Sequence, residues 1–144
     1  MPITPRKPRT SPRRPQRPTT PTPAERAALK TLTLIIKKLD TGKAEQIQAR
    51  DIRRLSALAD YVVIATGTSP RHTMALGYHL EQTLRTHDII PLTNAGDGDG
   101  SWVIVDLGNI IVHLLTAEAR TRYDLESLWR PSRRLSLPPP RKKI

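Results

Sequence analysis

Apolar side chains recur every three or four positions between residues 22 and 41, which predicts an amphipathic helix. Thr22, Pro23 and Glu25 form a capping box with proline at the first helical position, so the helix should begin there. Gly42 is placed to end it in a left-handed turn. We expect this helix to cover one face of a sheet.

The residues after this helix have the spacing of β-strands. Residues 47–52 alternate weakly, whereas residues 61–65 form a short continuous β-branched run that is typical of a strand buried on both faces. Ser69 and Pro70 repeat the cap and proline of a helix start. The helix that they predict has an apolar stripe of Thr73, Leu76, Leu80 and Leu84.

The second half of the sequence is rich in strand signals. Residues 88–92 predict a short strand, and residues 93–101 a polar loop with three glycines. Two β-rich runs joined at Gly108 and Asn109 predict a β-hairpin. Residues 117–129 predict a final helix. The order is α, β, β, α, β, β, β, α, so we predict an α/β fold with a mixed β-sheet flanked by helices and a single core.

The formal net charge of the chain is +11, and the surplus of positive charge lies at its two ends. Residues 1–23 hold six Lys or Arg, eight prolines and no acid, and residues 130–144 hold six Lys or Arg, four prolines and no acid. Residues 24–129 carry 12 basic and 13 acidic side chains. We therefore predict disordered basic tails over 1–22 and 130–144 and one domain over 23–129.

Two functions are open for the tails. They are either arms that neutralise nucleic-acid phosphates, which we favour, or solvated segments that only aid solubility. The N-terminal tail also has the composition of an organelle transit peptide, but a proline at about every third position forbids the amphipathic helix of such a peptide. The chain has no cysteine, which excludes disulfides and thiolate metal sites. No apolar run reaches the roughly 18 residues of a membrane span, and we expect a cytoplasmic protein.

The segment from Gly67 to His72 has the outline of a phosphate cradle, with a strand, a small-residue turn and a helix start. It lacks the Gly-Lys-Ser/Thr of a P-loop and the Gly-x-Gly-x-x-Gly of a dinucleotide fold. We therefore favour a structural turn with Ser69 as helix cap. Asp97 and Asp99 have too few neighbouring oxygen ligands for a calcium loop.

Trp102 is the most informative aromatic residue, because the chain holds two tryptophans and no phenylalanine. If Val103 and Val105 face the core, then Trp102, Ile104 and Asp106 face the other way. An aromatic on this second face is either covered by a helix or serves as an interface anchor, and the two are evenly balanced. His113 on the next strand is as consistent with a half-buried structural histidine as with a functional one.

Three blocks of the sequence, in this order, closely resemble the ribosomal silencing factor family, also called the Iojap family. They are DYVVIATGTSPRHTMAL, WVIVDLGNIIVHLL and EARTRYDLESLW. The resemblance covers about residues 47–129. It implies a small domain akin to the nucleotidyltransferase fold, with no enzymatic activity, no cofactor, no metal and no catalytic residue. It also implies binding to the large ribosomal subunit at ribosomal protein fourteen, which blocks association with the small subunit and represses translation when nutrients are short.

The sequence departs from the family pattern at two positions. Ala95 stands where many members carry Glu, and Asn109 where many carry an acid in the turn before the last strand. These changes put acidic contacts at the two positions in doubt. A weak homodimer of the free protein stays open, as does the host compartment.

The expected partner surface is the second face of the last two strands and the adjoining helix. Trp102 is the expected anchor, and its neighbours are Ile104, Asp106, His113, Arg120 and Tyr123, with Arg71 at the corner. The tails would add contacts to ribosomal RNA. The alternatives are a large-subunit assembly factor of an organelle or bacterium, a nucleotidyltransferase-type enzyme, and an RNA-binding protein that acts through its tails alone. The enzyme is disfavoured because the first acid after Gly67 is Glu81, late in the predicted helix.

Overall fold

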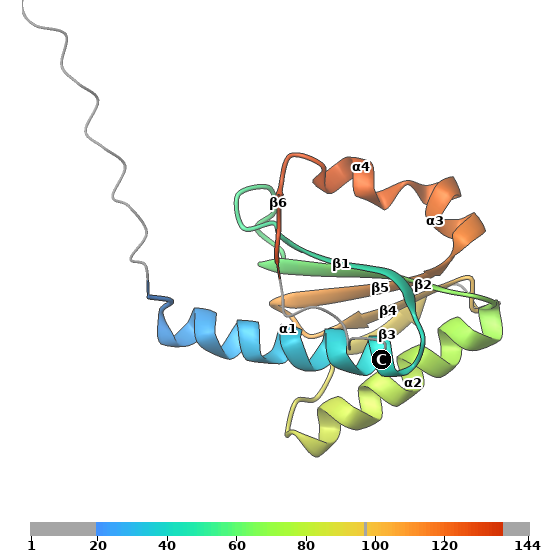
Figure 1. Cartoon of the computed structure of the whole chain (residues 1–144), viewed down its shortest axis with the longest axis horizontal. Helices are drawn as coiled ribbons and strands as arrows, with labels where there is room; N and C mark the ends of the chain where they lie inside the picture. Colours follow the sequence, from blue (N-terminus) through green and yellow to red (C-terminus); the bar gives the residue numbers. More distant parts are fainter. Residues whose placement is uncertain (1–19, 97, 137–144) are drawn as a thin grey trace, which may run out of the picture.

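The computed structural model describes residues 20–96 and 98–136 of the chain (Figure 1). Their helices and strands are, in chain order, α1 (Pro23–Thr41), β1 (Glu45–Asp51), β2 (Tyr61–Gly67), α2 (Pro70–Thr86), β3 (Thr93–Gly96), β4 (Trp102–Asp106), β5 (Ile110–Thr116), α3 (Ala117–Tyr123), α4 (Leu125–Trp129) and β6 (Arg133–Arg134). No helix among these residues is long and apolar enough to cross a membrane.

The strands form one mixed sheet in the order β3-β4-β5-β2-β1-β6. β2 and β5 pair in parallel, with Tyr61 opposite Ile110 and Gly67 opposite Thr116. All other neighbours pair antiparallel, including the predicted hairpin of β4 and β5. The α/β fold with a mixed sheet flanked by helices is therefore confirmed.

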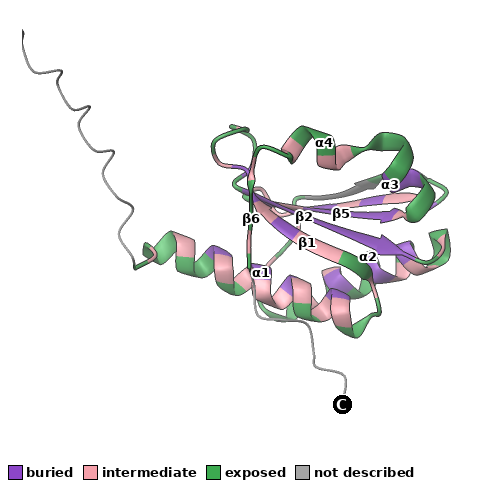
Figure 2. Ribbon diagram, turned by 45° about the horizontal axis from the view of Figure 1, so that its top comes forward, coloured by how far each residue is buried: buried purple, intermediate pink, exposed green. Residues whose placement is uncertain are grey.

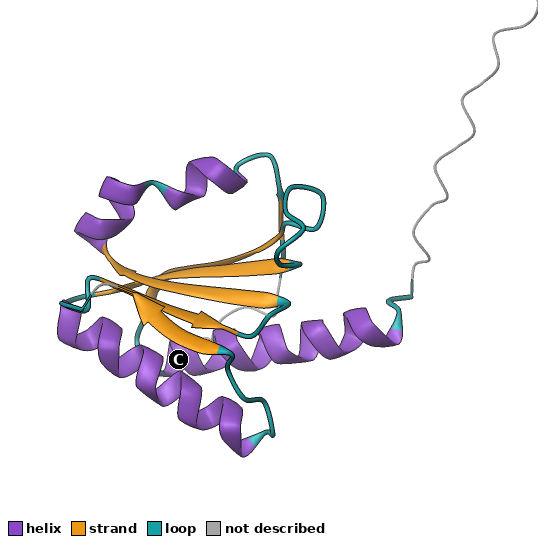
Figure 3. Cartoon of the chain, turned by 180° about the vertical axis from the view of Figure 1, so that it is seen from behind, coloured by secondary structure: helices purple, strands orange, loops and turns teal. Residues whose placement is uncertain are grey.

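Helices cover the sheet on both faces. α1 and α2 lie on one face, and α3 and α4 lie on the other (Figure 3). The larger core lies between α1, α2 and the sheet, and it holds the buried stripe Leu32, Ile35, Leu39, Leu76, Leu80 and Leu84. A smaller cluster under α3 is formed by Ile52, Ala59, Val62, Ile64, Leu115 and Ala119. β2 is buried along its whole length between the two clusters, as its unbroken β-branched run predicts (Figure 2).

The two long helices begin where the sequence predicts. The side chain of Thr22 accepts a hydrogen bond from the backbone N–H of Glu25, and that of Ser69 accepts one from His72. The predicted end of α1 is wrong in its geometry. Gly42 has a φ of −78°, and the left-handed residue is Lys43, with a φ of 65°. The turn is tightened by Gly42 N–H, which binds the carbonyl of Lys38.

Three further expectations are corrected. Residues 88–92 are not a strand, because β3 begins at Thr93 inside the segment expected to be a loop. The predicted helix over 117–129 is split, since Asp124 takes a left-handed φ of 46° between α3 and α4. The domain does not stop at residue 129. β6 adds a sixth strand beside β1, and Leu135 N–H binds the carbonyl of Ala49 at 2.9 Å.

Candidate partner-binding site on the open face of β4 and β5

The alternation of β4 places the expected site residues on one face of the sheet. Val103 and Val105 are buried against α2, whereas Trp102, Ile104 and Asp106 are half-buried on the opposite face. On β5 the residues directly across are Leu115, His113 and Ile111. This arrangement confirms the two-faced pattern that the sequence predicts for β4.

Four rings form an aromatic cluster, defined here as Trp102, His113, Tyr123 and Trp129. The ring centroids of Trp102 and Tyr123 are 4.7 Å apart, and those of His113 and Trp129 are 5.4 Å apart. The indole N–H of Trp102 donates a hydrogen bond to Nδ1 of His113 at 3.1 Å. α3 and α4 thus dock on the sheet through their aromatic side chains, and Trp102 is held in one orientation.

His113 is neutral in this cluster. Burial lowers its pKa from 6.5 to about 4, and the nearby carboxylate of Asp106 opposes the shift without cancelling it. Because Nδ1 accepts from Trp102, the neutral ring carries its proton on Nε2. His113 is therefore a fixed acceptor that orients the tryptophan.

Part of this face is open to solvent. The β4–β5 face, as we use the term, comprises Trp102, Ile104 and Asp106 of β4, Ile111 and His113 of β5, and Tyr123 of α3. α3 packs against β5 and β2 and leaves part of this face uncovered. Ile104 and Ile111 are therefore only half-buried, and Tyr123 is 39% exposed. Asp106 accepts from the backbone N–H of Gly108 at 2.7 Å and so shapes the hairpin turn. The result is an apolar patch with ordered aromatic side chains.

Arg120 lies behind this face rather than on it. Its side chain is only 9% exposed, and its Nε binds Oε1 of Glu126 at 2.6 Å. Its Nη1 donates to the carbonyl of Gln46 and to the hydroxyl of Thr66. The ion pair lowers the pKa of Glu126, whose other oxygen accepts from Gln48. Arg120 therefore positions α3 and α4 on the sheet, and no pattern in the sequence identifies its partners.

Arg71 lies apart from the aromatic cluster. It is exposed in the first turn of α2 and lines a hollow of about 670 Å³ together with Lys43, Glu45, Thr68, Ser69, His72 and Ala75. His72 beside it is a structural tie, since Nδ1 accepts from the N–H of Thr68 and Nε2 donates to the carbonyl of Gly42. The segment from Gly67 to His72 therefore joins α2 to the end of α1, as a structural turn should.

The remaining candidate residues that the structure describes make hydrogen bonds within turns and between backbone groups. Asp99 accepts from the backbone N–H of Ser101 at 2.9 Å, and Asp97 lies outside the described residues. The carbonyl of Asn109 accepts from the N–H groups of Asp60 and Tyr61, a role that does not depend on the type of its side chain. Among residues 20–96 and 98–136, no three His, Asp or Glu side chains gather in a metal-binding group.

Comparison with known proteins gives the family. The model of the family described as "Ribosomal silencing factor during starvation" matches residues 25–143. The chain belongs to the ribosomal silencing factor family. The ribosomal silencing factor of Halalkalibacterium halodurans is 32% identical over 98 residues, which are 68% of this chain and 84% of that protein. The match confirms the resemblance carried by the three sequence blocks.

A solved structure and a mouse protein are also similar to this chain. A crystal structure of a protein from Chromobacterium violaceum has a TM-score of 0.68 and 30% identity, and the match covers 75% of this chain and 89% of that one. The mouse protein named "Mitochondrial assembly of ribosomal large subunit protein 1" is 30% identical over 112 residues, which are 74% of this chain and 49% of that protein. The family thus has both bacterial members and organelle relatives.

Proposed function

We propose that this chain binds the large ribosomal subunit at ribosomal protein fourteen through its β4–β5 face and blocks association with the small subunit. Membership of the ribosomal silencing factor family supports this proposal. The observation that carries the choice of surface is the fixed, half-buried indole of Trp102 beside the half-buried Ile104. An aromatic side chain that is ordered before binding loses little conformational entropy in a complex, which is typical of interface anchors.

The residues of the surface have different roles in this proposal. Trp102, Ile104 and Tyr123 supply apolar contact, and Asp106 supplies a polar rim. His113 holds the indole, and Arg120 holds the helices that flank the patch. Arg71, in its separate hollow, would contact the partner only at the margin.

The proposed mechanism needs no chemical step. Joining two subunits requires the close approach of two large surfaces, and a folded domain docked on one of them prevents that approach by its volume. A standard protein interface buries about 800 Å² on each partner, which a sheet face with its flanking helices can provide. A protein without catalytic turnover, cofactor or metal is sufficient for this function.

The two basic ends of the chain would add an electrostatic component. Residues 1–19 and 137–144 lie outside the described part of the chain, and they carry nine Lys or Arg and no acid. Contacts between such segments and ribosomal RNA would release counterions, so subunit binding should weaken as the salt concentration rises.

Sedimentation of the tagged full-length protein through a sucrose gradient with purified subunits tests the proposal. We expect the protein to travel with the large subunit and not with the small one. Light scattering should then show that preincubation of large subunits with the protein slows and reduces subunit joining. Sedimentation with the small subunit, or joining at the normal rate with the protein bound, would contradict the proposal.

The mouse relative favours one alternative, an assembly factor for the large subunit, because its printed name assigns it that role. The alternative is separated by deleting the protein in its host. An assembly factor should leave incomplete large-subunit particles during rapid growth. A silencing factor should leave mature subunits whose joined fraction stays too high under starvation.

A further inference from the structure

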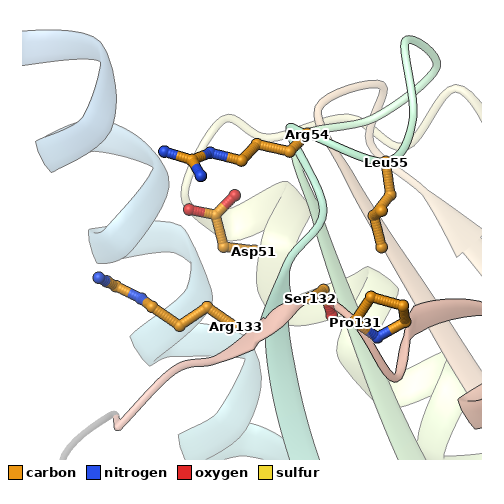
Figure 4. A pocket seen from close by; sticks show the side chains of 6 residues that line it. All are labelled: Asp51, Arg54, Leu55, Pro131, Ser132 and Arg133. Atoms are coloured by element: carbon orange, nitrogen blue, oxygen red, sulfur yellow. The ribbon is translucent and has the colours of Figure 1, made fainter. Parts of the chain in front are cut away.

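A basic cleft lies at the far edge of the sheet from β3, where the loop after β1 meets the segment that enters β6. Its volume is about 320 Å³, and it is lined by Asp51, Arg54, Leu55, Pro131, Ser132 and Arg133 (Figure 4). In the close view Arg54 and Arg133 extend to the same side, with Asp51 between them. The exposed Arg130 and Arg134 lie beside Pro131 and Arg133 in the sequence.

The one carboxylate that lines this cleft, Asp51, is already paired with an arginine outside the lining. The carboxylate of Asp51 is bound at both oxygens by Arg53, through Nε at 3.0 Å and Nη2 at 2.6 Å. Glu25 of α1 lies 3.5 Å from the same guanidinium. Arg54 and Arg133 are exposed and form no ion pair with any residue of the described part of the chain. Their positive charges are therefore available to an external anion.

The backbone that carries these arginines is held firmly. Arg133 stands opposite Asp51 in the β1–β6 pairing. Nη1 of Arg50 donates to the carbonyl of Ser132 at 3.0 Å. The N–H of Leu135 donates to the carbonyl of Ala49 on the other side of β6. Arg54 lies in a turn in which the N–H groups of Leu55 and Ser56 both donate to the carbonyl of Ile52. Both guanidinium groups thus start from fixed backbone positions, which lowers the entropy cost of binding a ligand between them.

We infer that this basic cleft binds the phosphate backbone of RNA. Arginine binds phosphate oxygens through paired N–H groups, and two unpaired arginines on one edge can contact successive phosphates. None of the six lining residues is aromatic, so the cleft offers no platform for stacking bases and its binding should not depend on sequence. The choice of RNA among polyanions rests on the proposed ribosomal function.

The cleft is separate from the β4–β5 face. β4 lies next to β3 at one edge of the sheet, and β6 is the strand at the other edge. The domain would therefore contact a ribosomal protein through one surface and RNA through another.

The double variant Arg54→Gln/Arg133→Gln of the full-length protein tests the inference with a short RNA hairpin as the probe. Its matched control is Lys30→Gln/Lys37→Gln, which removes two exposed charges from α1 and leaves both tails intact. We expect the arginine variant to bind the hairpin at least about fivefold more weakly. The negative slope of log K against log salt should become shallower by about 2. The lysine variant should match the wild type in both quantities.

A cross-linking measurement locates the contact independently of the tails. Leu55 lines the cleft and is 46% exposed, whereas Tyr78 on α2 is 59% exposed. A photoreactive phenylalanine analogue at position 55 should cross-link the hairpin, and the same analogue at position 78 should not. Equal losses in the two charge variants, or equal cross-linking at the two positions, would overturn the inference.

Two further outcomes separate the inference from its alternatives. Binding to vesicles containing anionic lipid that exceeds hairpin binding and depends on the same arginines would assign the cleft to a membrane surface instead of RNA. If the wild-type protein fails to sediment with large subunits while hairpin binding still depends on Arg54 and Arg133, the proposed function fails and the RNA site stands. If the wild-type protein sediments normally with large subunits while hairpin binding is unchanged in the arginine variant, the RNA site fails and the proposed function stands.

Discussion

The indole N–H of Trp102 donates to Nδ1 of His113, at 3.1 Å, across the antiparallel pair of β4 and β5. This bond requires the neutral imidazole, because a protonated ring has no acceptor at Nδ1. The face proposed to bind the ribosome is therefore coupled to the protonation state of one buried histidine.

Acid should destabilise the fold through His113. Burial lowers its pKa to about 4 in the folded protein from 6.5, so the unfolded chain binds the additional proton between these two values. The free energy of unfolding should consequently fall as the pH is lowered below about 6.5, by ~2 kcal/mol at pH 5. Urea denaturation at pH 7 and pH 5 measures this difference.

His113→Gln is the control for this prediction, since its amide oxygen can accept from Trp102 and does not titrate. The variant should lose most of the difference between pH 7 and pH 5. Glu126, whose pKa is lowered by Arg120, loses its stabilising effect only at more acidic pH. An unchanged difference in the variant would mean that another group is responsible.

Arg120 should be essential to the packing of α3 and α4. Truncation to Ala removes the ion pair with Glu126 and leaves the carbonyl of Gln46 and the hydroxyl of Thr66 without their donor. We expect a loss of about 2–3 kcal/mol of stability. Thermal melting measures it, and Arg122→Ala, an exposed position on the same helix, should change the stability by less than about 0.5 kcal/mol.

The end of the fold should lie beyond β6. Deleting residues 137–144 should leave the melting temperature unchanged, whereas deleting residues 131–144 should cost about 1–3 kcal/mol. The longer deletion removes the hydrogen bonds of β6 to β1 and the packing of Leu135 on the main core. Equal stability of the two truncated proteins would show that β6 contributes nothing.

Sequence periodicity predicts most of this fold for identifiable reasons. α1, α2 and β2 have strong local signals, because each cap and each buried side chain is specified by residues close to it in sequence. β3 is missed because Thr93 to Gly96 gains its strand structure from pairing with β4 and not from its own composition. β6 is missed for the same reason, since Arg133 and Arg134 resemble a solvated tail until β1 is placed beside them.

The candidate site divides in the same way. The alternation of β4 is sufficient to place Trp102, Ile104 and Asp106 on one face. Besides Glu126, the partners of Arg120 are 54 and 74 residues distant in sequence, at Thr66 and Gln46. No pattern in one sequence links positions so far apart. From the sequence alone, Arg120 is therefore interpreted as a surface residue that contacts a partner, although it is a buried residue that positions α3 and α4.

Gly67 should be required by the close approach of β2 to α2. A Cβ atom at this position would lie 2.4 Å from Oγ1 of Thr73 and 3.0 Å from its backbone N. Gly67→Ala should cost about 2 kcal/mol because the helix backbone must shift. Gly98→Ala is the control, since a Cβ there meets nothing within 4 Å. Thermal melting that ranks the two variants equally would contradict this role.

Ile104 offers the sharpest test of the β4–β5 face. It is half-buried beside the aromatic cluster, so arginine at this position can extend its charged group into solvent while its aliphatic part keeps some contact. Ile104→Arg should therefore cost only about 1 kcal/mol of stability. A complex that buries this position must desolvate the new charge, and we expect at least roughly thirtyfold weaker binding to the large subunit.

Tyr78→Arg is the matched control for Ile104→Arg, because Tyr78 is 59% exposed on α2, across the sheet from this face. It should melt and sediment like the wild type. Trp102→Ala is less decisive, because its indole both packs on the smaller core cluster and faces outward, so its loss should lower stability and binding together. A folded Ile104→Arg protein that sediments normally with large subunits would remove the β4–β5 face from the interface. A loss shared by the Tyr78 variant would instead place the partner across α2.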